Sequence, residues 1–178
     1  MTSLTAFTVL VALVALERLV ELVVSRRNAA WSFARGGTET GRGHYPFMVV
    51  LHSGFLLAML VEAWARRPEV EPPLAWTMLA LVVASQALRW WCIATLGRRW
   101  NTRVIVVPGL VPVTSGPYRF LAHPNYVAVV VEGIALPLVH EAWLTALVFT
   151  GANAALLTVR IRAENAALRT LAGRCVDA

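Results

Sequence analysis

The chain has 178 residues, of which 58% are hydrophobic and only 15% are charged. A soluble domain carries roughly a quarter charged residues, so this composition excludes an ordinary soluble enzyme and indicates an integral membrane protein. The formal net charge is +6, and every basic side chain apart from the histidines is an arginine.

Five apolar runs follow one another along the chain, each near the ~20 residues that a helix needs to cross a bilayer. They cover residues 4–24, 46–65, 74–96, 123–139 and 142–160. The fourth is the shortest, and a turn at Pro137 would let it pair tightly with the fifth. The pattern predicts an all-α integral membrane protein with about five transmembrane helices, in which residues 1–178 form a single membrane domain.

The arginines are distributed unequally between the two predicted sides of the membrane. Four lie in the loop 25–45, four in the segment 97–122 and four in the tail from residue 160, whereas the opposite side has only Arg66 and Arg67. The positive-inside rule then predicts a multi-pass protein of the cell membrane with its N-terminus outside and its C-terminus in the cytoplasm. The net charge reflects this topology and contact with anionic lipid, and not nucleic-acid binding.

Charged residues end the first run, where Glu17, Arg18 and Glu21 lie within about one helical turn. Ion pairing at a helix end that surfaces among lipid headgroups is one interpretation, and a functional role is the other. The loop 25–45 is rich in glycine, but no strand precedes it. It therefore predicts a flexible cytoplasmic loop and not a dinucleotide-binding turn.

The second and third runs each contain a polar side chain that needs a partner. His52 either bonds a carbonyl of a neighbouring helix or lines a substrate pocket, and both alternatives stay open. Arg89 is followed by two tryptophans, a pattern typical of a side chain that snorkels to an aromatic belt at the interface. The two cysteines, Cys92 and Cys175, indicate neither a disulfide nor a metal site.

Residues 103–117 combine a short apolar strip with several prolines, and they are too short and too proline-rich to span. They predict a re-entrant or interfacial segment, and irregular backbone at this depth is stable only against protein or a polar cavity. Glu132 in the fourth run also needs a partner or a cavity, because a carboxylate inside an apolar helix costs several kcal/mol. Arg160 and Arg119 are the candidate partners.

A polar segment, Gly116-Pro-Tyr-Arg-Phe-Leu-Ala-His-Pro-Asn-Tyr126, is wedged between two apolar runs, and Arg160 and Glu164 follow at an i,i+4 spacing. Each part has an ordinary explanation alone: a surface ion pair, a proline helix start, interfacial aromatic residues. Polar groups that cluster together at a membrane boundary are, however, commonly explained by a polar ligand. We therefore expect the active site here.

Gly116-Pro-Tyr118, His123-Pro-x-Tyr126 and Arg160-x-x-x-Glu164 resemble the C-terminal signature of the isoprenylcysteine carboxyl methyltransferase family. Members of that family are integral membrane proteins that bind S-adenosylmethionine, and the signature covers residues 97–168. The N-terminal part, with Glu21-Leu-x-x-Ser-Arg-Arg-Asn28 and Gly43-His-Tyr-Pro46, is similar to a bacterial branch of the family. Some members of this branch are associated with methylating alkylresorcinols or alkylpyrones made by type III polyketide synthases.

Carried over residue by residue, the resemblance implies an S-adenosylmethionine site formed by Leu110, Val111, Pro112, Val113, Tyr118, His123, Pro124, Asn125, Tyr126 and Glu164. It also implies that Arg160 holds the methyl acceptor. The family usually has an arginine directly before the His-Pro pair, where this chain has Ala122. Arg119, three residues upstream, is a candidate substitute.

The resemblance divides the single domain into two parts. Residues 1–96 would form three N-terminal spans on the lipid and substrate side. Residues 97–172 would supply the cofactor-binding connector on the cytoplasmic side, two spans and a short C-terminal helix over the site. The soluble Rossmann-type methyltransferase fold is excluded, because alternating strand and helix patterns are lacking.

Methyl transfer requires alignment and exclusion of water more than strong acids or bases. A carboxylate acceptor is already ionised, and Arg160 could bind it with a bidentate fork. A phenol, with a pKa near 10, would need a base or a nearby guanidinium, and His44, His52 and Glu132 are the candidate bases. We expect catalytic roles for Arg160, Glu132 and His52, and substrate binding by Arg160, His44, His52 and Asn28.

The sequence thus predicts an S-adenosylmethionine-dependent O-methyltransferase whose site faces the cytoplasm. Its acceptor would be a carboxylate, or a phenol or pyrone hydroxyl, of a lipophilic small molecule that enters from the bilayer. A functional link to a type III polyketide synthase is a further expectation. Three alternatives stay open: a phospholipid amine N-methyltransferase, an NADPH-dependent enzyme similar to sterol reductases, and a non-enzymatic membrane scaffold.

Overall fold

The computed structural model describes residues 3–176, without the side chains of residues 42 and 168–176. Predictions that concern the side chains of Arg42, Arg169, Arg174 and Cys175 lie outside the described part. In chain order the elements are α1 (Ser3–Phe33), β1 (Thr38–Thr40), η1 (Arg42–His44), α2 (Tyr45–Arg66), α3 (Pro72–Leu96), η2 (Gly97–Arg99), β2 (Val104–Val106), η3 (Gly116–Arg119), α4 (Pro124–Leu138) and α5 (Trp143–Val176).

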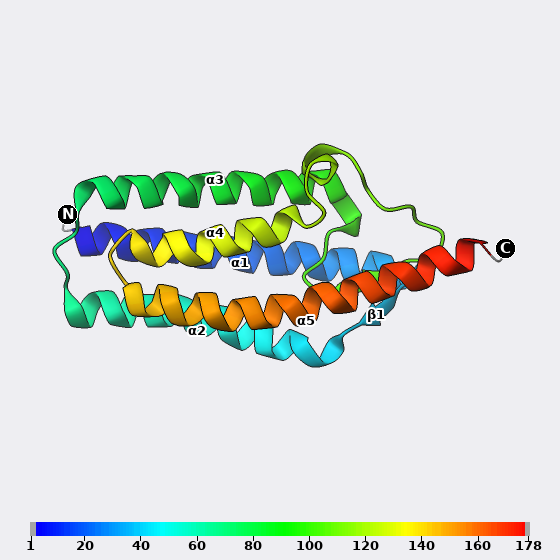
Figure 1. The fold of residues 1–178 in the computed structure, drawn as a ribbon, viewed down its shortest axis with the longest axis horizontal. Helices are drawn as coiled ribbons and strands as arrows, with labels where there is room; N and C mark the ends of the chain where they lie inside the picture. The colour runs from blue at the N-terminus through cyan, green and yellow to red at the C-terminus, as the bar shows by residue number, and fades with distance from the viewer. Residues whose placement is uncertain (1–2, 177–178) are drawn as a thin grey trace.

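The α-helices of the described part form an elongated bundle in which successive helices run in opposite directions (Figure 1). One end holds the N-terminus, the α2–α3 turn and the α4–α5 turn. The other end holds β1, the C-terminal part of α5 and the connector, residues 97–123, which joins α3 to α4. The short helix α4 packs between α3 and α5.

Local sequence signals fix where these helices begin and end. Pro46 and Pro124 stand at the starts of α2 and α4, where the missing N–H has no helical partner to lose. Arg67 ends α2 in a left-handed conformation with φ 43°. At the start of α5, the Glu62 carboxylate of α2 accepts hydrogen bonds from the backbone N–H groups of Leu144 (3.1 Å) and Thr145 (2.8 Å), which the first turn of a helix leaves unpaired.

Within the described residues, three helical stretches are long and apolar enough to cross a membrane: Tyr45–Arg66, Pro72–Arg99 and Trp143–Ala167. Pro124–Leu138 is apolar but shorter. Large apolar side chains such as Val50, Leu57, Trp76 and Leu147 are exposed on the outside of the bundle, as expected where the solvent is lipid. The prediction of an all-α membrane protein is confirmed.

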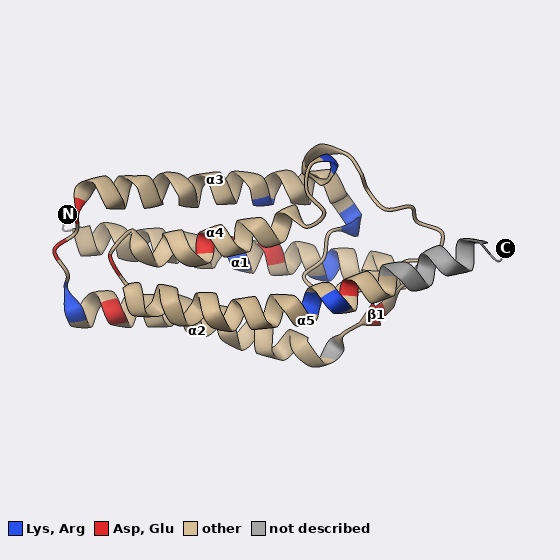
Figure 2. Cartoon of the chain, viewed as in Figure 1, with Lys and Arg blue, Asp and Glu red and all other residues tan. Residues whose placement is uncertain are grey.

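Charged residues gather at the two ends of the bundle, and a small group lies halfway along it (Figure 2). The apolar core includes Phe7, Val11, Phe55, Met59 and Leu136, which belong to the parts of α1, α2 and α4 nearer the end that carries the N-terminus. The polar side chains at the opposite end are not part of this core and can line a binding site.

The structure differs from the predicted elements at three places. α1 continues to Phe33, so the first part of the predicted loop 25–45 is helical. The predicted C-terminal helix is continuous with the fifth apolar run as α5. β1 and β2 form an antiparallel pair that the sequence did not predict, with Thr38 opposite Val106 and Thr40 opposite Val104. Strands of three residues are too short for a periodic pattern to reveal.

Buried polar groups explain why α1 extends beyond its apolar run. Glu21, Ser25, Asn28 and Ser32 are buried at spacings of three and four residues, on one face of the helix. Ser25 accepts a hydrogen bond from the backbone N–H of Thr102 at 3.0 Å, and the Asn28 amide donates to the carbonyls of Gly97 (3.1 Å) and Trp100 (2.7 Å). This polar face attaches the connector to the bundle.

Candidate active site

Two cavities meet at the end of the bundle that carries the connector. The first, the polar cleft, holds about 700 Å³, part of it open to solvent, and is lined by the connector and by the adjoining ends of α4 and α5. The second, the apolar cavity, holds about 970 Å³ between the helices, part of it also open to the outside of the bundle. Five residues line both and form the shared wall: Trp100, Asn101, Asn125, Tyr126 and Arg160.

Five of the ten predicted cofactor residues come together in the polar cleft. Tyr118, His123, Asn125, Tyr126 and Glu164 line it, although they come from η3, the last connector residue, the first turn of α4 and α5. Pro124 does not line the cleft; it is buried at the start of α4, between His123 and Asn125 in the sequence. The sequence signature thus marks one contiguous site.

The segment Leu110–Val113 lies outside the lining of both cavities. Val111 is exposed, and its carbonyl accepts a hydrogen bond from Arg99 Nη1 at 2.8 Å. Arg99 itself lines the polar cleft, so the segment contacts a residue of the cleft without lining it. Its direct contact with a cofactor stays a prediction.

The Tyr126 hydroxyl connects the two cavities chemically. It accepts a hydrogen bond from Arg160 Nε at 2.9 Å and donates one to the Glu164 carboxylate. The His123 ring stacks on the Tyr126 ring with 5.2 Å between centroids, and His123 Nδ1 lies 3.8 Å from Glu164 Oε2. Arg160 and Glu164, which are four residues apart on α5, are therefore linked to each other by hydrogen bonds to the same tyrosine hydroxyl.

Arg160 is a buried guanidinium whose contacts are with uncharged groups. Besides Tyr126, its Nη2 donates to the Thr102 carbonyl at 2.7 Å, and its Nη1 lies 2.8 Å from Met48 Sδ. None of these three partners carries a negative charge that would neutralise it. A charge that is buried at the border of two cavities in this way attracts an anionic ligand or an oxygen that is becoming anionic.

Two groups near this site have shifted protonation equilibria. Burial raises the pKa of the Tyr118 hydroxyl, and Cys92 and Glu164 nearby raise it further, so Tyr118 stays a neutral hydrogen-bond donor. Burial, and then the charge of Arg160, lower the pKa of His44, so His44 is neutral at physiological pH. His44 does not line either cavity, although Tyr45 next to it lines the apolar cavity.

His52 lines the apolar cavity. This agrees with the alternative that His52 lines a pocket, and not with the alternative that it bonds a carbonyl of a neighbouring helix. The carbonyl it binds belongs to its own helix, because Nδ1 lies 2.9 Å from the oxygen of Met48 one turn earlier. A carbonyl only accepts, so Nδ1 carries the proton, and in the neutral ring Nε2 keeps its lone pair. The ring edge packs on Phe149 at 5.3 Å between centroids.

Asn28 was expected to bind substrate, but it lies outside both cavities. Its side-chain nitrogen donates to two carbonyls of the connector, as described above, and this occupies both N–H groups. Asn28 thus holds the connector that forms one side of the polar cleft, and substrate binding by Asn28 stays a prediction that this geometry does not support.

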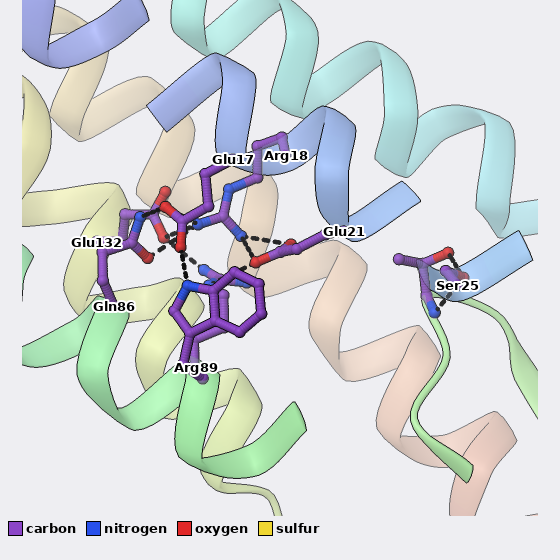
Figure 3. A network of polar contacts seen from close by, with 9 residues as sticks. Glu17, Arg18, Glu21, Ser25, Gln86, Arg89 and Glu132 are labelled. Atoms are coloured by element: carbon purple, nitrogen blue, oxygen red, sulfur yellow. Dashed lines mark hydrogen bonds and ion pairs between the residues drawn. The ribbon is translucent and has the colours of Figure 1, made fainter. Parts of the chain in front are cut away.

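A buried charge cluster lies deeper in the bundle and contains Glu132 (Figure 3). It consists of Glu17, Arg18, Glu21, Gln86, Arg89 and Glu132, from α1, α3 and α4. The partners of Glu132 are Arg89 and Arg18, the latter at 3.3 Å. The expectation that Arg160 or Arg119 pairs with Glu132 is wrong, because α4 directs this carboxylate toward α1 and α3.

The same cluster decides two further predictions. Arg89 does not snorkel: it is only 6% exposed, and its Nε lies 3.7 Å from Glu21 Oε1. The expected ion pairing of Arg18 with Glu21 is present at 2.7 Å, but Glu21 is buried and Arg18 also binds Gln86 of α3 at 2.9 Å, so the pair lies inside the bundle and not on its surface. Glu132 is absent from the lining of both cavities, so a catalytic role for it is a prediction that this geometry does not support.

The structure also reveals site residues that the sequence did not single out. Trp100 and Asn101 of the shared wall follow α3 in a stretch without a motif. Asn153 of α5 lines the apolar cavity, and its only sequence signal is an amide inside an apolar run. Among the described residues, the buried Oδ1 atoms of Asn125 and Asn153 have no hydrogen-bond partner. Both atoms belong to residues that line a cavity.

Comparison with known proteins points in the same direction as the geometry. Residues 78–170 match the model of the isoprenylcysteine carboxyl methyltransferase (ICMT) family. The uncharacterized protein YpbQ of Bacillus subtilis is 38% identical over 164 residues, which are 92% of this chain and 96% of that protein. An uncharacterized protein of Haemophilus influenzae is 26% identical over 155 residues, 86% of this chain and 90% of that protein. No solved structure is significantly similar to this chain.

Proposed function

The chain belongs to the isoprenylcysteine carboxyl methyltransferase family, and we propose that it transfers a methyl group to an oxygen of a lipophilic small molecule. Membership gives the broad activity, that of a membrane-embedded methyltransferase that uses S-adenosylmethionine. The identity of the methyl acceptor and the assignment of roles to residues are the proposal.

The shared wall is the observation that carries this proposal. A polar cleft that opens at the end of the bundle meets an apolar cavity between the helices. Arg160 and Tyr126 lie in the wall that both cavities share. A water-soluble donor and a lipid-soluble acceptor need this arrangement, because each must arrive from a different solvent and meet the other at one point.

The side chains of the polar cleft fit S-adenosylmethionine. Glu164 suits an ammonium or ribose hydroxyls, while Arg99 and Arg103 suit a carboxylate. The stacked rings of His123 and Tyr126 can stabilise a sulfonium by a cation–π contact. The unpaired Oδ1 of Asn125 is an acceptor that a bound donor would satisfy.

When bound, S-adenosylmethionine supplies a methyl group on a positively charged sulfur; the sulfur–carbon bond breaks as the oxygen–carbon bond forms, and S-adenosylhomocysteine remains. Arg160 holds the acceptor oxygen at the shared wall and stabilises its negative charge. For a carboxylate this is sufficient. For a phenol or pyrone hydroxyl, His52 is the base that takes the proton, because it lines the same cavity and its Nε2 has a free lone pair when Nδ1 bonds the Met48 carbonyl.

The proposal includes the topology and the division of the chain. All residues that line the polar cleft lie between Leu96 and Glu164, in agreement with a cofactor-binding part at 97–172. The antiparallel alternation of the helices favours five crossings, with the connector and the arginine-rich end in the cytoplasm. The acceptor enters the apolar cavity from the bilayer, and a type III polyketide synthase is the proposed source of a phenolic acceptor.

Calorimetric titration of the detergent-purified protein with S-adenosylhomocysteine tests the cofactor site. We expect micromolar binding, weakened roughly 10- to 100-fold in Glu164→Gln and in His123→Ala, because each variant removes a charged or aromatic contact of the cleft. Glu69→Gln, an exposed carboxylate at the opposite end of the bundle, is the matched control and should bind as the wild type does. Absence of binding in folded wild-type protein would exclude this function.

A further inference from the structure

Tyr126 links a cation to an anion at the shared wall. Its hydroxyl accepts a hydrogen bond from Arg160 Nε at 2.9 Å and donates its proton to the Glu164 carboxylate. A hydroxyl has one proton and two lone pairs, so it can serve both partners at the same time. The three side chains thus form one hydrogen-bonded row, which runs from guanidinium to hydroxyl to carboxylate.

The two ends of this row face different cavities. Glu164 lines the polar cleft only, whereas Arg160 lines the apolar cavity as well. Tyr126 lies between them in the wall that the two cavities share. The carboxylate end is therefore accessible to a ligand from the cleft, and the guanidinium end is accessible to a ligand in the apolar cavity.

A charge that binds at one end of the row acts on the other end. Hydrogen bonds in a chain polarise one another, and inside a protein they are screened less than in water. A cation or a hydrogen-bond donor at Glu164 compensates the carboxylate, so less of its negative charge reaches Arg160 through Tyr126. The guanidinium then attracts an anion more strongly. The reverse effect has the same size, because coupling between two binding sites is reciprocal.

We propose that Tyr126 is a positioning residue that couples the two sites, so that the cofactor and an anionic acceptor oxygen each strengthen the binding of the other. The inference rests on the proposed function, which places an ammonium or hydroxyls of the cofactor at Glu164 and the acceptor oxygen at Arg160. With both ligands bound, positive and negative groups alternate along the row. Each ligand supplies the group that one end lacks.

The coupling sets the order in which ligands bind and leave. An acceptor that arrives before the cofactor meets an Arg160 whose charge is partly compensated through Tyr126, so tight binding of the acceptor follows binding of the cofactor. Methyl transfer then converts the anionic oxygen into an uncharged ester or ether. The methylated product no longer strengthens the binding of S-adenosylhomocysteine, and both products therefore dissociate more readily than the substrates.

Calorimetric titration of the full-length protein in lipid nanodiscs with decanoate and with methyl decanoate tests the proposal. Saturating S-adenosylhomocysteine should tighten the binding of decanoate about tenfold and should change that of the uncharged ester by less than about twofold. Saturating decanoate should tighten the binding of S-adenosylhomocysteine by the same factor as in the first titration. Both probes partition into lipid equally with and without S-adenosylhomocysteine, so the ratio of affinities cancels this partition.

Tyr126→Phe should reduce the coupling factor to about twofold or less, because the hydroxyl that links Arg160 to Glu164 is lost. Tyr118→Phe is the matched control, since it removes a hydroxyl of the same cleft that lies near Cys92, and it should retain the factor. The factor compares two affinities of one protein, so a purely structural loss of affinity cancels from it. Glu164→Gln, which keeps an acceptor for the Tyr126 proton but has no charge, should also lose the factor and serves if Tyr126→Phe does not fold.

Several outcomes would overturn the proposal. They are a wild-type affinity for decanoate that does not respond to S-adenosylhomocysteine, equal tightening of decanoate and its ester, and a factor that persists in Tyr126→Phe or is lost in Tyr118→Phe as well. Absence of decanoate binding with S-adenosylhomocysteine present would also overturn it, since Arg160 would then not receive an anion. Failure of the wild type to bind S-adenosylhomocysteine would instead remove the proposed function.

Discussion

The two groups of charged residues in this protein differ in how their charges are compensated. In the buried charge cluster, Arg18 and Arg89 face the carboxylates of Glu21 and Glu132, and each charge has a partner of opposite sign. At the shared wall, Arg160 contacts a hydroxyl, a carbonyl and a thioether sulfur. The charges of the cluster are neutralised within the protein, whereas the charge of Arg160 is not neutralised by the groups that it contacts.

This difference distinguishes charged residues that stabilise the fold from a charged residue that is available to bind a ligand. A buried ion pair is stable only while both partners are present, because removal of one leaves the other uncompensated in a medium of low dielectric constant. A buried guanidinium with neutral partners keeps an electric field that is available to a ligand. Substitutions in the first group should therefore change stability, and substitutions in the second should change catalysis.

The largest effect is expected from Arg89→Met in the buried charge cluster. This change leaves Arg18 alone with three carboxylates, and removal of one partner of a buried pair costs about 3–5 kcal/mol. Unfolding by sodium dodecyl sulfate in mixed micelles measures the loss. The affinity for S-adenosylhomocysteine of the fraction that stays folded should be unchanged, since Arg89 does not line the polar cleft.

The double variant Arg89→Met/Glu132→Leu is the matched control for this effect. It removes both charges of one pair and replaces them with apolar groups, which in buried pairs is often close to neutral. We expect it to recover most of the lost stability. If the double variant is as unstable as the sum of the two single ones, the charges do not act as a pair.

The cluster also shows what the sequence could reveal and what it could not. Hydropathy predicted the helices, and the requirement that Glu132 have a partner followed from its position in an apolar run. The identity of that partner could not be predicted, because Arg18 is more than one hundred residues away and depends on how α1, α3 and α4 pack. Arg89 was misjudged because two exposed neighbouring tryptophans are also the pattern of an interfacial anchor.

The second largest effect is expected from Arg160→Lys at the shared wall. Lysine keeps the charge but loses the planar fork and with it the simultaneous contacts to Tyr126 and Thr102. We expect kcat/KM for methyl transfer to fall about 100-fold, as when an electrostatic donor is removed from an active site. Unfolding stability should fall by no more than about 1–2 kcal/mol, the value of hydrogen bonds to uncharged partners.

Arg162→Lys provides the matched control, because it makes the same change two residues further on, at an exposed position of α5. Its activity should be within about twofold of the wild type. Were Arg160→Lys to lose stability and activity in parallel, Arg160 would belong with the structural charges, and the contrast between the two groups would disappear.

Part of the lining of the polar cleft could be named from the sequence, and the reason is chemical. Tyr118, His123, Tyr126 and Glu164 belong to a signature with fixed order and spacing, so they could be named before their contacts were known. Asn153 belongs to no such signature. A single amide in an apolar run is equally typical of a hydrogen bond between two helices and of a residue that lines a binding cavity. Only the cavity and the unpaired Oδ1 distinguish the two.

The smallest effect is expected from Tyr126→Phe, which keeps the ring that stacks on His123 and removes the hydroxyl between Arg160 and Glu164. The loss of these two hydrogen bonds should lower kcat/KM about tenfold, since each is worth roughly 1 kcal/mol and water can enter the open cleft to replace part of it. Tyr118→Phe is the natural comparison, because it removes a hydroxyl that lies near Cys92 and does not touch Arg160.

A larger loss of kcat/KM in Tyr118→Phe than in Tyr126→Phe would show that the link between the two cavities does not run through Tyr126. The expected order, by contrast, would mean that Arg160 is held in place by the same residue that contacts the carboxylate of the cofactor site, so that both halves of the reaction are positioned by one side chain.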